Sequence, residues 1–132
     1  MPVTQKSAPA TVSRFKTLTR YLLGLLFITA GINHFLHTAT YVSIMPPYLP
    51  WHLELVYVSG VAEAGLGLLL LARRLAVFAA WGLVALCIAV FPANLHMAIN
   101  ADLYPVLPAM VWWLRLPAQG LLIAWAWWYT RR

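Results

Sequence analysis

The sequence predicts an all-α, polytopic membrane protein: an antiparallel four-helix transmembrane bundle with both termini in the cytoplasm. Hydrophobic residues make up 63% of the chain, whereas soluble domains contain about 45–50% apolar residues. Only 9% of the residues are charged, which is too few to cover the surface of a water-soluble globule. With 132 residues, the chain has the length of a single domain.

Four apolar runs follow a polar, basic start. We expect residues 1–12 to form a disordered basic tail, and residues 13–132 to form the transmembrane domain, with Ser13 as the N-cap of the first helix. A signal peptide is the alternative for this start, but the first run continues through Phe35 without a clear cleavage site. Each span comes near the ~20 residues that a helix needs to cross a bilayer, and the predicted spans are about 18–36, 53–72, 75–97 and 109–129.

The three connections differ in composition. The segment 37–52 contains no Lys or Arg and is rich in Pro, Tyr and Trp. Because Pro interrupts regular helices and aromatic rings collect at membrane interfaces, we expect it to fold over the membrane surface. Arg73 and Arg74 form a tight basic turn between the second and third spans, and the segment 98–108 is polar and then Pro-rich.

The basic residues predict the orientation of the spans. They fall before the first span, between the second and third, and after the fourth, whereas the other two connections contain none. The positive-inside rule therefore places both termini and the Arg73–Arg74 turn in the cytoplasm and the other two connections outside. The net charge of +6 does not indicate a nucleic-acid partner, because the basic residues lie at the ends of apolar runs and not on one soluble face.

Cysteine and histidine usage excludes several kinds of site. The single cysteine, Cys87, rules out a disulfide framework and lies inside a predicted span, where we expect a small packing residue. The sequence contains no His or Cys spacing typical of a metal or haem site, so no metal is predicted. It contains neither a Gly-rich phosphate loop nor a soluble catalytic domain, and it leaves open whether the protein is an enzyme.

Glu63 is an acid near the middle of the second span. An ionised acid at the bilayer centre costs roughly 2.5–3.5 kcal/mol on insertion scales, so we expect Glu63 to point into the bundle and to be protonated, paired or close to water. Arg115 in the fourth span is its expected partner, since the two lie at depths of roughly 15 and 9 Å from the same side, at 1.5 Å per residue. Such a pair would either line a ligand cavity or fix helix register, and Arg115 alone could instead reach the outer headgroups.

Other polar residues are expected in the same half of the bundle. With Glu63 and Arg115 they form a predicted ligand-binding or buried polar cluster, whose other members are Asn33, His34, Asn94, His96 and Gln119. Histidines on facing helices can bind haem or hydrogen-bond the carbonyl groups of a quinone. A quinone is the favoured ligand and haem the weaker candidate, while each histidine taken alone is typical of a hydrogen-bonded residue at the interface.

The chain also resembles a known family. The residues that carry the resemblance are GINHF (31–35), MPPYLPWHLELVYVSGVAEAGLGLLL (45–70), AVFPANLHMAIN (89–100) and WLRLPAQ (113–119). On these stretches the chain resembles the DoxX-like family of small four-span bacterial membrane proteins, which is named after a subunit associated with a terminal quinol oxidase. The resemblance implies the bacterial cytoplasmic (inner) membrane, a link to quinone or redox chemistry, and no agreed set of catalytic residues.

Three functions follow as expectations. The first is a redox-linked accessory or quinone-binding subunit that associates with other membrane redox subunits. The second is a non-enzymatic assembly or scaffold protein that binds a partner through the small residues Gly60 and Ala64. The third is a small-molecule carrier, which would have to act as a dimer because four spans make a small transporter.

Overall fold

The computed structural model describes residues 10–131, and this part of the chain contains helices and no strand. Three of its helical segments, Arg14–Leu36, His52–Leu71 and Arg73–Ile99, are long and apolar enough to cross a membrane. The elements are α1 (Ala10–Leu36), α2 (Thr38–Ser43), α3 (His52–Leu71), the 3₁₀ turn η1 (Arg73–Leu75), α4 (Ala76–Ile99), the 3₁₀ turn η2 (Ala101–Leu103) and α5 (Ala109–Trp128).

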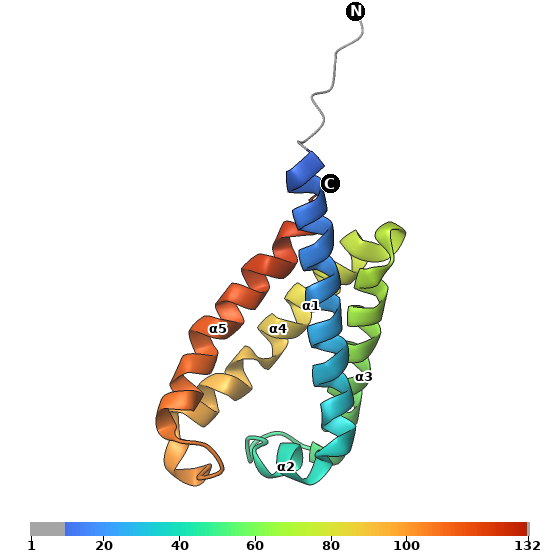
Figure 1. Cartoon of the computed structure of the whole chain (residues 1–132). Coiled ribbons are helices and arrows are strands. Elements are labelled where there is room, and N and C mark those ends of the chain that lie inside the picture. The colour runs from blue at the N-terminus through green and yellow to red at the C-terminus, as the bar shows by residue number, and fades with distance from the viewer. Residues whose placement is uncertain (1–9, 132) are drawn as a thin grey trace, which may run out of the picture.

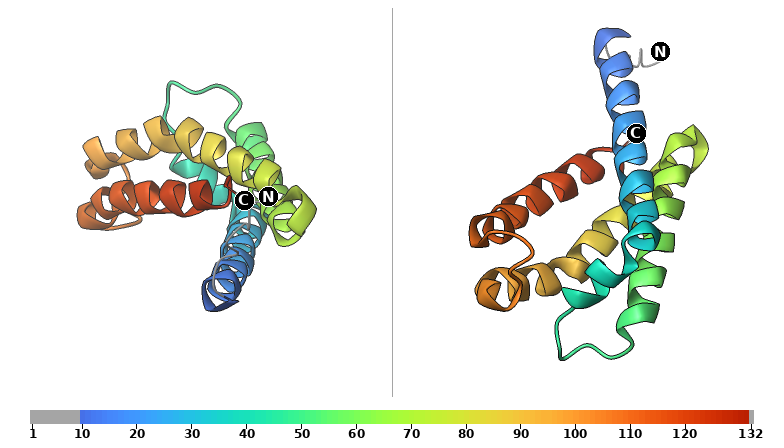
Figure 2. Two further views of the ribbon diagram at one scale, coloured as in Figure 1. Left: turned by 90° about the horizontal axis from the view of Figure 1, so that it is seen from above. Right: turned by 60° about the horizontal axis from the view of Figure 1, so that its bottom comes forward.

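The four long helices run in alternate directions and form two pairs, α1 with α3 and α4 with α5 (Figure 1). The pairs are joined where α3 packs against α4 beside η1. At the end of the molecule that holds η1 and the C-terminus, here called the terminal end, α5 comes close to α1. At the opposite end, here called the α2 end, the two pairs diverge, as both views in Figure 2 also show.

The predicted helix boundaries agree with the structure to within one or two residues for α3, α4 and α5. The first helix differs, because α1 begins at Ala10 and Ser13 lies inside it. Alanine is the strongest helix former, and the polar composition of this stretch does not prevent the helix from extending. The rest of the predicted basic tail, residues 1–9, lies outside the described residues.

Glycines bring α1 and α3 to backbone contact. A Cβ built on Gly31 would lie 2.5 Å from the carbonyl oxygen of Gly60, and one on Gly24 would lie 2.8 Å from that of Gly67. Both pairs are spaced seven residues apart on their helices, so they recur on the same face. Gly60 and Ala64, which were expected to form a docking face under the scaffold hypothesis, are therefore covered by α1 of the same chain.

The terminal end is closed by polar contacts as well as by apolar packing. Tyr129 donates from Oη to Oγ1 of Thr19 at 2.7 Å, which ties the end of α5 to α1. Arg20 is buried and donates from Nη1 to the carbonyl oxygen of Leu70 at 2.6 Å. This carbonyl is one of the last four of α3, which have no partner inside the helix, so Arg20 caps α3. Beneath these contacts lies an apolar core that includes Leu23, Leu83 and Cys87.

Candidate ligand-binding site

A cavity of about 280 Å³ lies toward the α2 end, where the helix pairs diverge. We call it the first cavity. Most of its wall is apolar, and residues from α1 to α5 contribute to it. Its polar side chains are His34, Tyr41, Ser59, Glu63, Asn94, Arg115 and Gln119. Five of the seven residues of the predicted cluster therefore share one cavity.

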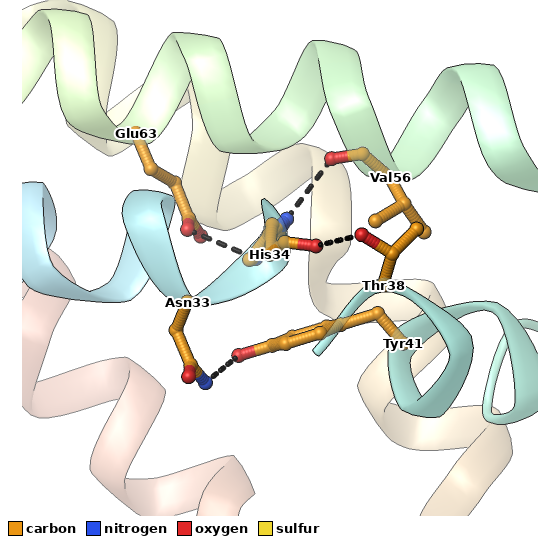
Figure 3. A network of polar contacts seen from close by, with 6 residues as sticks. All are labelled: Asn33, His34, Thr38, Tyr41, Val56 and Glu63. Atoms are coloured by element: carbon orange, nitrogen blue, oxygen red, sulfur yellow. Dashed lines mark hydrogen bonds and ion pairs between the residues drawn. The ribbon is translucent and has the colours of Figure 1, made fainter. Parts of the chain in front are cut away.

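His34 and Glu63 face each other across the contact between α1 and α3 (Figure 3). The distance from His34 Nε2 to Glu63 Oε2 is 3.1 Å, and the side chains are only 11% and 18% exposed. On the other side of the ring, Nδ1 lies 3.0 Å from the carbonyl oxygen of Val56. A carbonyl oxygen only accepts hydrogen bonds, so Nδ1 carries a hydrogen and donates it to Val56.

The 3.1 Å contact between Nε2 and Oε2 is favourable only when one of the two groups carries a further proton. This proton resides either on Nε2, which gives an imidazolium beside a carboxylate, or on Glu63, which gives a neutral imidazole beside a carboxylic acid. Both forms carry no net charge, and neither leaves an isolated carboxylate in an apolar wall. Within the described part of the chain, Oε2 of Glu63 accepts no well-aligned hydrogen bond. The two side chains are therefore in close contact, but this oxygen still lacks a hydrogen-bond donor.

The helix α2 covers this pair at the α2 end. Thr38 donates from Oγ1 to the carbonyl oxygen of His34 at 2.9 Å, and the ring of Tyr41 lies 4.1 Å from that of His34, between centroids. Asn33 donates from Nδ2 to Oη of Tyr41 at 2.8 Å (Figure 3). Tyr41 was not among the predicted site residues. The spacing of His34, Thr38 and Tyr41, four and seven residues along, would have indicated a shared helical face, but the prolines nearby argued against a helix.

A second polar contact joins α4 to α5. Asn94 donates from Nδ2 to Oε1 of Gln119 at 2.6 Å, and Gln119 donates from Nε2 to the carbonyl oxygen of Cys87. Pro92 frees the carbonyl of the residue four positions before it, which is Ile88, so the carbonyl that Gln119 binds is its neighbour. The bond from Gln119 therefore goes to Cys87 and does not supply a donor for the carbonyl of Ile88.

Arg115 is not the direct partner of Glu63. Within residues 10–131, no carboxylate lies within 4.0 Å of its guanidinium, and the guanidinium donates no hydrogen bond to the protein. Its charge instead lies over the ring of Trp112, with Cζ 5.2 Å from the ring centroid. Residue counting placed Arg115 and Glu63 at depths that allow them to pair. In the structure, His34 of α1 occupies the position beside Glu63. Arg115 and Glu63 line the same cavity without touching.

His96 lies outside the wall of the first cavity, in an aromatic cluster with Tyr48 and Tyr104. Asn100 Nδ2 lies 3.3 Å from Nδ1 of His96 and can only donate to it. The hydrogen of His96 is then on Nε2, which is buried and unpartnered among the described residues. Burial also raises the pKa of the neighbouring Tyr104 hydroxyl, so that group stays protonated at neutral pH. His34 and His96 thus belong to separate clusters.

The described residues offer no group of three or more His, Cys, Asp or Glu side chains that could hold a metal ion.

A family model matches most of the chain. The model of a family described as Domain of unknown function (DUF8561) matches residues 23–130, which include all five helices apart from the start of α1. Searches of curated proteins and of solved structures give no match.

Proposed function

We propose that this chain, which belongs to the DUF8561 family, is a membrane-embedded subunit that binds a quinone-class molecule in its first cavity. The observation that carries the proposal is the His34–Glu63 pair in the wall of a largely apolar cavity that also contains Arg115. The resemblance to the DoxX-like family, which is independent of this geometry, points to the same chemistry.

The proposal includes a membrane arrangement with four spans, in which α5 crosses the bilayer beside α4. Three facts support it. α5 has 20 residues, which is the length that a span needs. Its one charged residue, Arg115, lines a cavity and so avoids a fully lipid-exposed position. The terminal end carries Arg14, Lys16, Arg20, Arg73, Arg74 and Arg131, whereas the α2 end carries Glu54 and Asp102. The positive-inside rule then puts both termini in the cytoplasm, in a bacterial inner membrane.

A quinone head matches the wall of the first cavity. It is a flat apolar ring with two carbonyl oxygens that only accept hydrogen bonds, and Arg115 has five N–H donors with no acceptor among the described residues. The volume of about 280 Å³ is at the lower limit of ligand pockets, about 300 Å³, and suits a single ring.

The His34–Glu63 pair would exchange protons with the bound head. Reduction of a quinone to a quinol takes up two electrons and two protons. The pair would deliver one proton from Nε2 or from the carboxyl group, and the second proton would come from water after the pair has been reprotonated. Electrons would come from a partner redox subunit in the same membrane. In this role the chain is an accessory subunit that binds the quinone and handles protons.

The test is the quinone content of the protein after gentle release from its own membrane, measured by solvent extraction and mass spectrometry. Glu63→Gln removes the shared proton but preserves the shape of the side chain, and we expect about tenfold less bound quinone, equal to the loss of one charge-assisted hydrogen bond. Glu54→Gln is the matched control, since Glu54 is an exposed acid in the first turn of the same helix.

A double variant tests whether His34 and Glu63 act as one unit. If they do, adding His34→Gln to Glu63→Gln lowers quinone content little further, because residues in one pair have non-additive effects. Wild-type protein without quinone, or equal quinone content in the Glu63→Gln and Glu54→Gln variants, would refute the proposal. Full additivity would refute the role of the pair.

A further inference from the structure

A second cavity, of about 380 Å³, lies next to the first at the α2 end. Tyr41, Ile44 and Arg115 line both cavities and form the wall between them. The second cavity contains neither His34 nor Glu63, but it shares Arg115 with the proposed quinone site. The five N–H donors of one guanidinium are enough to serve a ligand in each cavity. From its charge and its hydrogen-bond donors, we infer that the second cavity is a binding site for a phosphate group, supplied by an anionic phospholipid of the surrounding leaflet.

The charge of the second cavity is uncompensated. Arg115 is permanently protonated, and no Asp or Glu belongs to the lining. Within the described residues, no carboxylate comes within 4.0 Å of this guanidinium. Glu63, the acid on the far side of the shared wall, is already paired with His34. A half-buried guanidinium whose donors are unused needs acceptors, and a phosphate or carboxylate satisfies two of them at once.

Neutral groups in the lining can also donate. Oη of Tyr41 accepts the hydrogen bond from Asn33 at 2.8 Å, so its own hydrogen is available to a ligand. Thr40 supplies a hydroxyl and His37 an imidazole to the same lining. Trp112 supports the guanidinium from the protein side through the cation–π contact. Donors without carboxylates favour an anion over a neutral or cationic head group.

The surroundings favour the lipid as the source of the phosphate. The remaining lining residues, Ile44, Val106 and Leu107, are apolar, and Val106 and Leu107 are exposed side chains of the connection before α5. They lie where the glycerol and the first carbons of the acyl chains of a lipid would run. Free phosphate would use the same donors but would gain nothing from this apolar rim.

The experiment is native mass spectrometry of the purified protein in detergent, titrated separately with phosphatidylglycerol, phosphatidylcholine and inorganic phosphate. We expect one phosphatidylglycerol to bind at least about tenfold more tightly than phosphatidylcholine, whose choline cancels the phosphate charge. Arg115→Gln should lose about tenfold or more in affinity, and Arg115→Lys should lose less because it preserves the charge.

A pair of loop variants separates charge from shape. Leu107→Asp places a carboxylate in the second cavity, while Leu107→Asn has the same size without the charge. Leu107 is on an exposed connection, so both variants should fold. We expect the Asp variant to bind phosphatidylglycerol about tenfold less tightly than the Asn variant and to retain its quinone.

The outcomes are distinct. Equal affinity for the two lipids, or equal affinity of the Asp and Asn variants for phosphatidylglycerol, would overturn the phosphate site. Inorganic phosphate that binds as tightly as the lipid and displaces it would support the site and assign it to free phosphate. A Leu107→Asp variant that loses lipid but retains quinone would support the site independently of the proposed function.

Discussion

Gly60 and His34 are in direct contact, so that a Cβ built on Gly60 would lie 2.9 Å from the Cβ of His34. This contact places the imidazole within 3.1 Å of Glu63, three residues further along α3. Gly31, three residues before His34, makes the closest approach of the two backbones possible. The geometry of the site therefore depends on glycines that take no part in its chemistry.

Gly60→Ala should damage the fold and the site together. Neither the backbone of α1 nor His34 can move easily to make room for the methyl group. We therefore expect the free energy of unfolding to fall by about 1–3 kcal/mol, typical of overpacked cores. The displaced His34 should also hold less quinone. Reversible unfolding in mixed detergent micelles measures the first effect, and quinone extraction measures the second.

Gly65→Ala is the control for this prediction. Gly65 is in the same helix, and a Cβ there would meet nothing within 4 Å. The change should be neutral or stabilising by up to about 1 kcal/mol, because alanine favours helix over glycine. Equal losses in the two variants would mean that the helix contact does not position His34.

Hydrophobic pattern and polarity predicted the helices and the inward position of Glu63, but not its partner. Depth along each span follows from residue counting at 1.5 Å per residue, and depth allowed Glu63 and Arg115 to meet. Which helix lies beside α3 at that depth depends on the contacts of Gly31 and Gly60. The sequence shows where these small residues are, but it does not show which neighbouring helix each of them faces.

The position of His96 could not be predicted for a related reason. Its place near the end of α4 agrees with the prediction to within two residues, and a compact bundle would have put it near His34. The two helix pairs instead diverge at the α2 end (Figure 1), and Tyr48 and Tyr104 surround His96. Helix divergence arises from the combined packing of all the faces, which no local pattern encodes.

Arg20 should be the basic residue whose loss costs most stability. It is 8% exposed and caps a terminal carbonyl of α3 at 2.6 Å. Arg20→Met preserves the apolar stem and removes the donor, so we expect a loss of about 1.5–3 kcal/mol, typical of a hydrogen bond to a charged group. Unfolding in mixed micelles measures it. Arg14→Met is the control, since Arg14 is exposed on the same helix, and a loss of the same size there would contradict the capping role.

The proposed orientation predicts which positions an impermeant thiol reagent can reach. In a Cys87→Ala background, Leu103→Cys at the α2 end should be labelled on intact cells. Ala72→Cys, an exposed position beside the Arg73–Arg74 turn, should be labelled only after the membrane is permeabilised. Neither change removes a basic residue, so the positive-inside signal is retained. The reverse labelling pattern would invert the topology and place the first cavity in the cytoplasmic half.

Gln119 should hold α4 and α5 together around Cys87. It is 5% exposed, and its amide joins Asn94 to the carbonyl of Cys87. Gln119→Leu leaves both groups without this partner, so we expect the free energy of unfolding to fall by about 1–3 kcal/mol.

Because Cys87 is the only cysteine of the chain and is buried, its labelling by a small membrane-permeant maleimide reports local opening. Labelling should be faster in Gln119→Leu than in the wild type and unchanged in Gly120→Ala, the next residue of α5, where a Cβ would meet nothing within 4 Å. Equal labelling rates in all three proteins would show that α4 and α5 stay closed without Gln119.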